Sequence, residues 1–167
     1  MDTESHQPNA RQIIGLLGWV VVVFAFAGIG ALASTSAAEF YAQLSRPTWA
    51  PPASVFGPVW TLLYAGMAIS AWLIWRAHGF TRGRTALALF MVQLALNALW
   101  SWLFFVWHQG ALAFIEVVLL WLLIVATVIS FWRLDRLPAL LMLPYLAWVS
   151  FATALTWATW QLNPGLL

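Results

Sequence analysis

Five long apolar runs dominate this chain of 167 residues and constrain what it can fold into. They cover residues 13–32, 55–75, 86–107, 111–132 and 137–160. An α-helix rises about 1.5 Å per residue, so roughly 20 apolar residues cross a hydrocarbon core of about 30 Å. The length of each run matches this requirement. The sequence therefore predicts an all-α membrane protein, folded as a bundle of five transmembrane helices.

The overall composition also favours a membrane, because 63% of the residues are hydrophobic and only 7% are charged. Residues 1–12 form the expected N-terminal tail, and residues 13–167 form one transmembrane domain. A cleaved signal peptide is an alternative for the first run, since Arg11 precedes it and small residues such as Ala31 and Ala33 end it. Its apolar core is, however, longer than that of a typical signal.

The connection between the first two runs, residues 34–54, is much longer than the others. It contains Pro47, Trp49, Pro51 and Pro52. Long connections in compact domains are commonly binding loops or lids. We therefore expect this first loop to act as a lid.

The distribution of the arginines predicts the orientation of the chain. With five spans, the N-terminus and the second and fourth connections share one side of the membrane. That side carries Arg11, Arg76, Arg82, Arg84, Arg133 and Arg136, and the other carries only Arg46. Basic residues are enriched on the cytoplasmic side, so we expect a cytoplasmic N-terminus and an outer C-terminus. Apolar helical spans suit a bacterial cell membrane, which we expect as the location. Arginines scattered in this way give no nucleic-acid-binding patch.

Three of the runs carry stripes of polar, aromatic and small residues on one helical face. The stripes are Trp60, Tyr64, Met67 and Ala71; Gln93, Asn97, Trp100 and Phe104; and Tyr145, Trp148, Ala152 and Leu155. Large rings beside small residues leave room for a flat ligand, but close helix packing produces the same spacing. The two amides are equally suited to hydrogen bonds between helices. Spacing alone leaves these alternatives open.

Few other residues carry chemistry. Glu116 is the only acid well inside a run, where it is either functional or held by a structural hydrogen bond. The chain has no cysteine, and His6, His78 and His108 fall in the tail and in separate connections. We therefore predict no metal site and no required cofactor.

Three motifs resemble the TspO/MBR family, also known as tryptophan-rich sensory, translocator or peripheral benzodiazepine receptor proteins. The first is Arg46-Pro47-Thr48-Trp49-Ala50-Pro51-Pro52 with residues 57–64, the second comprises residues 93–100 with Phe104-Phe105, and the third comprises residues 144–148 with 151–155. They stand in the order and spacing of the family, and the resemblance covers nearly all of residues 41–163.

The resemblance implies a five-helix bundle, usually dimeric, with a pocket that opens toward the first loop. It implies a porphyrin, such as protoporphyrin IX or haem, as the ligand. Transferred position by position, the ligand-binding residues are Trp49, Trp60, Tyr64, Asn97, Trp100, Tyr145, Trp148, Ala152 and Leu155. Trp60 and Trp148 match positions that the family associates with light- and oxygen-dependent porphyrin breakdown, so they are the candidates for any catalytic role.

Two departures limit this transfer. Thr156 stands where many members have Asn, and no basic residue follows Tyr145, so the sterol motif of animal members is not supported. We expect a binder, sensor or transporter of porphyrins, with the bilayer and a second copy of the chain as partners. The alternatives are a porphyrin-degrading activity and a structural regulator of tetrapyrrole metabolism.

Overall fold

The computed structural model describes residues 7–167, with side chains from residue 10 onward. The long helices of this part are α1 (Gln7–Ala33), α3 (Phe56–Arg82), α4 (Arg84–Ser101), α5 (Gly110–Leu134) and α6 (Arg136–Leu162). The short segments are α2 (Ala37–Gln43), the 3-10 turn η1 (Ala53–Val55) and the π-helical turn η2 (Trp102–Val106). Five helical spans are long and apolar enough to cross a membrane, which confirms the predicted all-α bundle.

Several helices extend beyond the predicted runs. α1 begins at Gln7, so residues 7–12 of the expected tail are helical, and residues 1–6 lie outside the described residues. α3 continues past residue 75 to Arg82, and Gly79 within it has a φ of 61°, which glycine adopts without steric cost. Hydropathy marks only the apolar part of a helix, whereas backbone hydrogen bonds continue into its polar ends.

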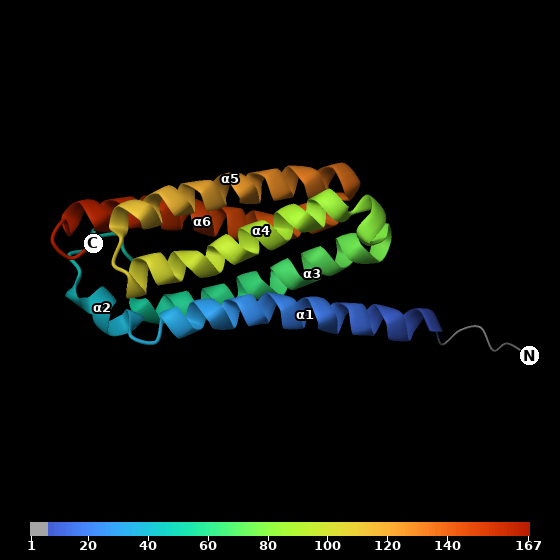
Figure 1. The fold of residues 1–167 in the computed structure, drawn as a ribbon, viewed down its shortest axis with the longest axis horizontal. Helices are drawn as coiled ribbons and strands as arrows, with labels where there is room; N and C mark the ends of the chain where they lie inside the picture. The colour runs from blue at the N-terminus through green and yellow to red at the C-terminus, as the bar shows by residue number, and fades with distance from the viewer. Residues whose placement is uncertain (1–6) are drawn as a thin grey trace, which may run out of the picture.

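The helices run back and forth along one axis, so their connections gather at two ends (Figure 1). One end holds the start of α1 and the α3–α4 and α5–α6 connections. The opposite end, which we call the loop end, holds α2, the first loop, the connection into α5 and the C-terminus. α5 packs on α4 and α6, and α1 packs on α3 and α4. Trp19 and Val23 of α1 are buried in the common core, so α1 is an integral part of the bundle.

Small residues allow close approach between neighbouring helices, as is usual in membranes. A methyl group added at Gly15 would clash with the Trp75 ring, so α1 meets α3 closely there. On the other side of α3, the Ser70 hydroxyl donates to the carbonyl oxygen of Pro138 on α6 at 2.7 Å. These residues therefore make their contacts within one chain.

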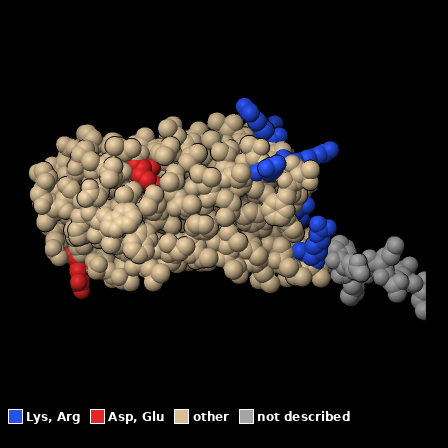
Figure 2. Space-filling model, in the orientation of Figure 1, with Lys and Arg blue, Asp and Glu red and all other residues tan. Residues whose placement is uncertain are grey.

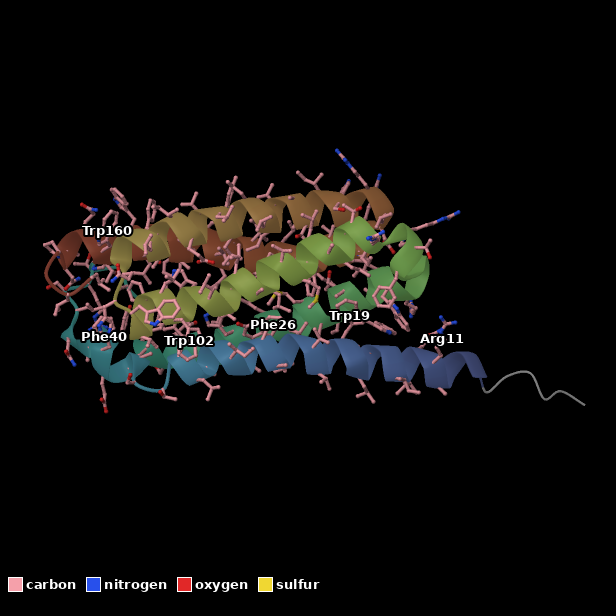
Figure 3. All side chains as sticks on the ribbon, viewed as in Figure 1. Arg11, Trp19, Phe26, Phe40, Trp102 and Trp160 are labelled. Carbon is pink, nitrogen blue, oxygen red and sulfur yellow. The ribbon has the colours of Figure 1, made fainter. Side chains whose placement is uncertain are left out.

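Charge is distributed unevenly along the bundle. On the face drawn in Figure 2, basic side chains gather at the end where α1 begins. Figure 3 places Arg11 at that end and Phe40, Trp102 and Trp160 in the opposite half. Among the arginines of that end, Arg76 lies 4.7 Å from the Trp72 ring centroid and Arg136 lies 5.6 Å from that of Trp132. Which side of the membrane this end faces stays a prediction.

Candidate ligand-binding site

The first loop forms a strap between α1 and α3. After α2, residues 44–52 contain only a short turn, in which the N–H of Ala50 donates to the carbonyl oxygen of Pro47 at 3.0 Å. Prolines in this stretch restrict φ and remove backbone donors, so neither a helix nor a strand can continue through it. η1 then leads the chain from Pro52 into α3.

Two side chains tie this strap to the rest of the molecule. The Tyr41 hydroxyl donates to the carbonyl oxygen of Pro51 at 3.1 Å. Asn163, just after α6, accepts from the Ser45 N–H and donates to the Ser45 carbonyl oxygen, each at 2.8 Å. Its amide also donates to the carbonyl oxygen of Thr159 at 2.7 Å. The role of Asn163 is not recognisable from the sequence, because this contact joins residues 118 positions apart.

Aromatic rings connect the strap with the bundle by two routes. Trp49 is 50% exposed and packs edge-on against Phe151 of α6, whose ring centroid lies 5.4 Å from that of Trp148. Tyr41 lies 5.6 Å from Phe56, which in turn lies 5.9 Å from Trp148. Both routes meet at Trp148. We call these five residues the loop aromatics; three of them, Tyr41, Phe56 and Phe151, were not predicted as site residues from the sequence.

Some buried polar atoms near the loop end have no hydrogen-bond partner among the described residues. They include the indole nitrogens of Trp100 and Trp148 and both carboxyl oxygens of Glu116. Leaving a buried donor or acceptor unpaired costs about 1–3 kcal/mol. The hydrogen bond considered as the structural role of Glu116 is therefore not found in the described part of the chain.

A hydrogen-bonded network joins α3, α4 and α6. The Tyr64 hydroxyl donates to Asn97 Oδ1 at 2.6 Å, Asn97 Nδ2 donates to the Tyr145 hydroxyl at 3.1 Å, and that hydroxyl donates to Gln93 Oε1 at 2.8 Å. All four side chains are buried, and we call them the polar layer. Both polar atoms of the Asn97 amide are thus paired with tyrosines. This is the arrangement expected when amides bond between helices.

Trp60 lies against the polar layer. Its ring centroid is 5.4 Å from that of Tyr64 and 6.1 Å from that of Tyr145. Four of the predicted ligand-binding residues, Trp60, Tyr64, Asn97 and Tyr145, are therefore neighbours in the structure. Trp49 and Trp148 are connected separately, through the loop aromatics.

The remaining predicted site residues lie on α4 and α6. Trp100 stacks on Phe104 with centroids 5.0 Å apart and meets Phe105 edge-on at 5.7 Å. Ala152 and Leu155 follow Trp148 by about one and two helical turns, and Leu155 is buried whereas Ala152 is partly exposed.

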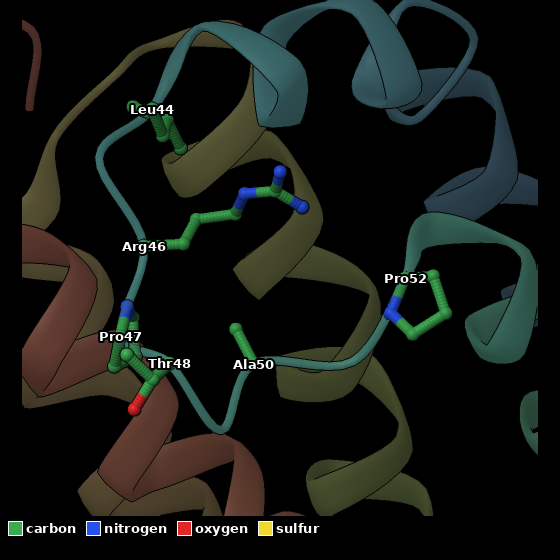
Figure 4. A pocket seen from close by; sticks show the side chains of 6 residues that line it. All are labelled: Leu44, Arg46, Pro47, Thr48, Ala50 and Pro52. Atoms are coloured by element: carbon green, nitrogen blue, oxygen red, sulfur yellow. The ribbon is translucent and has the colours of Figure 1, made fainter.

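An open surface hollow of about 440 Å³, which we call the first-loop cavity, lies inside the curve of the first loop (Figure 4). Its lining residues are Leu44, Arg46, Pro47, Thr48, Ala50 and Pro52. Figure 4 shows the Arg46 side chain extending from the strap into the space that the loop encircles. The guanidinium carbon lies 4.6 Å from the centroid of the Tyr41 ring.

A second hollow, of about 300 Å³, lies beside α2 and includes Glu39, Phe40 and His108 in its lining. His108 has a φ of 51° and stacks on Phe40 with centroids 4.2 Å apart. His78 belongs to α3, near the opposite end of the bundle, and His6 lies outside the described residues. The two described histidines thus belong to different ends of the molecule.

Comparisons with known proteins agree on one family. A model of the TspO/MBR family matches residues 19–161, which reach from α1 to α6. The chain is 40% identical to protein CrtK of Rhodobacter capsulatus over 140 residues, covering 81% of this chain and 84% of that protein. It is 38% identical to the translocator protein of Homo sapiens over 129 residues, covering 76% of each.

A third relative is the tryptophan-rich sensory protein of Cereibacter sphaeroides. It is 36% identical over 151 residues, which cover 88% of this chain and 94% of that protein. The match therefore extends over nearly the whole length of both chains. With five apolar spans and this breadth of similarity, the chain is an integral multi-pass membrane protein and belongs to the TspO/MBR family.

Proposed function

We propose that this protein binds a porphyrin, or a similar flat hydrophobic molecule, beneath its first loop and acts as a sensor or carrier of that molecule. The observation that carries the proposal is the position of Trp148. Two chains of aromatic contacts from the first loop meet at its ring. Its buried indole N–H has no partner among the described residues, so it can donate to a ligand.

The chemistry of the loop aromatics suits such a ligand. Their rings come from the first loop, α3 and α6, so a ligand between them would contact several elements at once. Ligand pockets are mostly apolar and aromatic, with a few polar groups that fix orientation. The half-exposed Trp49 gives access from the loop end. Relatives named as sensory and translocator proteins accord with this role.

The test is a titration of the purified full chain in detergent with protoporphyrin IX, followed by the shift of the porphyrin absorption band. We expect saturable binding to wild type. Removing a ring that contributes about 1.5 kcal/mol should weaken binding roughly tenfold, so Trp148→Leu should show this loss. Trp132→Leu is the matched control, because Trp132 is exposed at the opposite end. Equal losses in both variants, or binding that never saturates, would contradict the proposal.

A second candidate function is light- and oxygen-dependent breakdown of the bound porphyrin. The aromatic contacts of both candidate residues favour it. Trp60 lies against Tyr64 and Tyr145, and Trp148 lies where the two routes of loop aromatics meet. Indole is easily oxidised, whereas the phenylalanine ring is not. Under illumination at matched bound fractions, wild type should lose porphyrin absorbance and the double Trp60→Phe, Trp148→Phe variant should not. Equal decay in the two proteins would exclude these residues from the chemistry.

We also infer that the N-terminus is cytoplasmic, that the loop end faces outward, and that the protein forms a homodimer. The orientation rests on the arginines, of which six belong to the end where α1 begins and one to the loop end. Reporter fusions at both termini test the orientation, and an outer N-terminus would contradict it.

Cross-linking at low protein-to-lipid ratio tests the homodimer, and a protein that remains monomeric would contradict that inference.

A further inference from the structure

Arg46 is the only arginine at the loop end and one of seven in the chain. The other six follow the usual enrichment of basic residues on one side of the membrane. Arg46 lies on the side that this rule leaves poor in basic residues. Orientation therefore does not account for its charge, and a local role must be sought in its surroundings.

The surroundings of Arg46 hold its guanidinium at the cavity of the first loop. The guanidinium lies over the ring of Tyr41, whose hydroxyl is bonded to Pro51 and whose ring packs against Phe56. The preceding residue, Ser45, is fixed by Asn163. Both tethers of the strap thus act on the segment that presents this side chain.

The contact with Tyr41 does not use the N–H groups of the guanidinium as hydrogen-bond donors. Arginine stacks on an aromatic ring through its face, while its N–H groups point outward in the plane of the group. That planar fork matches the two oxygens of a carboxylate. The other residues that line the cavity are uncharged, namely Leu44, Pro47, Thr48, Ala50 and Pro52. The acid nearest in sequence, Glu39, lines the separate hollow beside α2.

We propose that Arg46 and the first-loop cavity form a subsite for a carboxylate of the ligand. This inference rests on the proposed function and specifies the ligand class as a flat hydrophobic acid. Tyr41 and Phe56 connect the guanidinium with Trp148 through successive ring contacts. An acid whose carboxylate reaches Arg46 can therefore place its apolar body against the loop aromatics. Arg46 then selects between acids and their neutral esters.

The expected effect is moderate because Arg46 is exposed to solvent. Exposed ion pairs are weak, whereas hydrogen bonds to charged groups are stronger than neutral ones. Between these two limits, we expect that loss of the guanidinium weakens binding of the acid about 5- to 20-fold. The contribution should also fall at high ionic strength, because salt screens exposed charges.

The experiment compares protoporphyrin IX with its dimethyl ester, which has the same ring system and no carboxylate. Both are titrated against wild type, Arg46→Gln and Arg46→Lys, at low and high salt. Arg46→Gln should weaken binding of the acid by the stated factor and leave binding of the ester within about twofold. Arg46→Lys keeps the charge and loses the planar fork, so its affinity for the acid should lie between those of wild type and Arg46→Gln. Its affinity for the ester should match that of wild type. Arg136→Gln is the matched control, since that arginine stacks on Trp132 at the opposite end.

The outcomes separate this subsite from the proposed function. Equal losses of acid and ester binding in Arg46→Gln would overturn the subsite, because Arg46 would then act only by shaping the loop. Unchanged acid binding in that variant would overturn it as well. Wild type that binds only the ester would contradict the subsite and leave the proposed function standing. Wild type that binds neither compound would overturn the proposed function, and the subsite with it.

Discussion

The polar layer and the loop aromatics lie in the same bundle and differ in how far their polar atoms are already paired. In the polar layer, the side chains of Tyr64, Asn97 and Tyr145 are bonded to one another and to Gln93 Oε1, and Gln93 Nε2 is the one side-chain polar atom of these four residues without a partner in the described part of the chain. Beneath the first loop, the indole N–H of Trp148 is buried without a partner among the described residues. We infer that a polar group inside a membrane bundle is a stronger candidate for a ligand contact when its neighbours leave it unpaired.

The difference has a physical cause. Hydrocarbon offers no hydrogen bonds, so a polar side chain on one helix is stabilised mainly by a partner on another helix or by a ligand. Tyrosine hydroxyls on α3 and α6 meet the Asn97 amide on α4 and fix these helices relative to one another. At the loop end, aromatic rings fill the space instead, and one of them, Trp148, carries an N–H donor without a partner among the described residues. We therefore propose that the polar layer serves stability and that the loop aromatics serve binding.

The largest expected effect is the loss of stability in Asn97→Leu. This change removes the acceptor of the Tyr64 hydroxyl and the donor to the Tyr145 hydroxyl, and leaves the former unpaired in the bundle. We expect the free energy of unfolding to fall by about 2–3 kcal/mol, measured by denaturation in mixed detergent micelles. Affinity for protoporphyrin IX, measured while the variant is folded, should change less than about threefold.

The double variant Asn97→Leu, Tyr64→Phe sharpens this prediction. Tyr64→Phe removes the hydroxyl that Asn97→Leu leaves unpaired, so the two losses of stability should be less than additive, with a coupling of about 0.5–3 kcal/mol. Normal stability of Asn97→Leu together with a tenfold or greater loss of porphyrin affinity would contradict a structural role of the polar layer. Asn97 would then belong to the ligand site, as the family resemblance implies.

A smaller effect is expected when the first loop is released from Asn163, which bonds to Ser45. Asn163→Leu removes both bonds to Ser45, worth about 1–2 kcal/mol together, so the first loop should open more often. Hydrogen exchange of residues 44–52 should become faster, and porphyrin affinity should fall about 3- to 10-fold. Gln161→Leu is the matched control, because that amide is exposed at the same end of α6. Unchanged exchange in Asn163→Leu would show that the strap does not depend on this tether.

The smallest effect is expected when a ring of the loop aromatics is replaced by another ring. Trp148→Phe keeps an aromatic surface and loses the indole N–H, so porphyrin binding should weaken about 2- to 10-fold, corresponding to about 0.5–1.5 kcal/mol. The stability of the unliganded protein should be unchanged or slightly higher, because an unpaired buried donor is removed. A marked loss of stability with unchanged affinity would place Trp148 with the polar layer instead.

The sequence predicts the spans well, because a run of about 20 apolar residues has few alternatives to a transmembrane helix. Periodicity also places Gln93, Asn97 and Trp100 on one face of α4. It does not reveal which groups meet that face. Tyr64 and Tyr145 are close to Asn97 only because three helices cross there, so the choice between ligand contact and structural bond requires the fold.

The first loop shows the limit of sequence reasoning more clearly. Its prolines predict an irregular connection, and α2 within it was not predicted because seven residues carry little periodicity. Asn163 follows the last span as an ordinary polar residue, and only its contact with Ser45 identifies it as a tether. Similarly, the role of Arg46 depends on Tyr41 and on the curve of the strap around the cavity.

The central claim, that the ligand lies beneath the first loop, is tested most directly by paramagnetic broadening of the tryptophan indole N–H signals. The chain has 13 tryptophans, and they are distributed along the bundle. The two ends of the bundle are roughly 30–40 Å apart, because a helix rises about 1.5 Å per residue. Binding of manganese protoporphyrin, compared with diamagnetic zinc protoporphyrin, broadens signals steeply with proximity. We predict strong broadening of Trp49 and Trp148 and sharp signals from Trp72, Trp75 and Trp132. Broadening of the latter three, with Trp49 and Trp148 unaffected, would contradict the account.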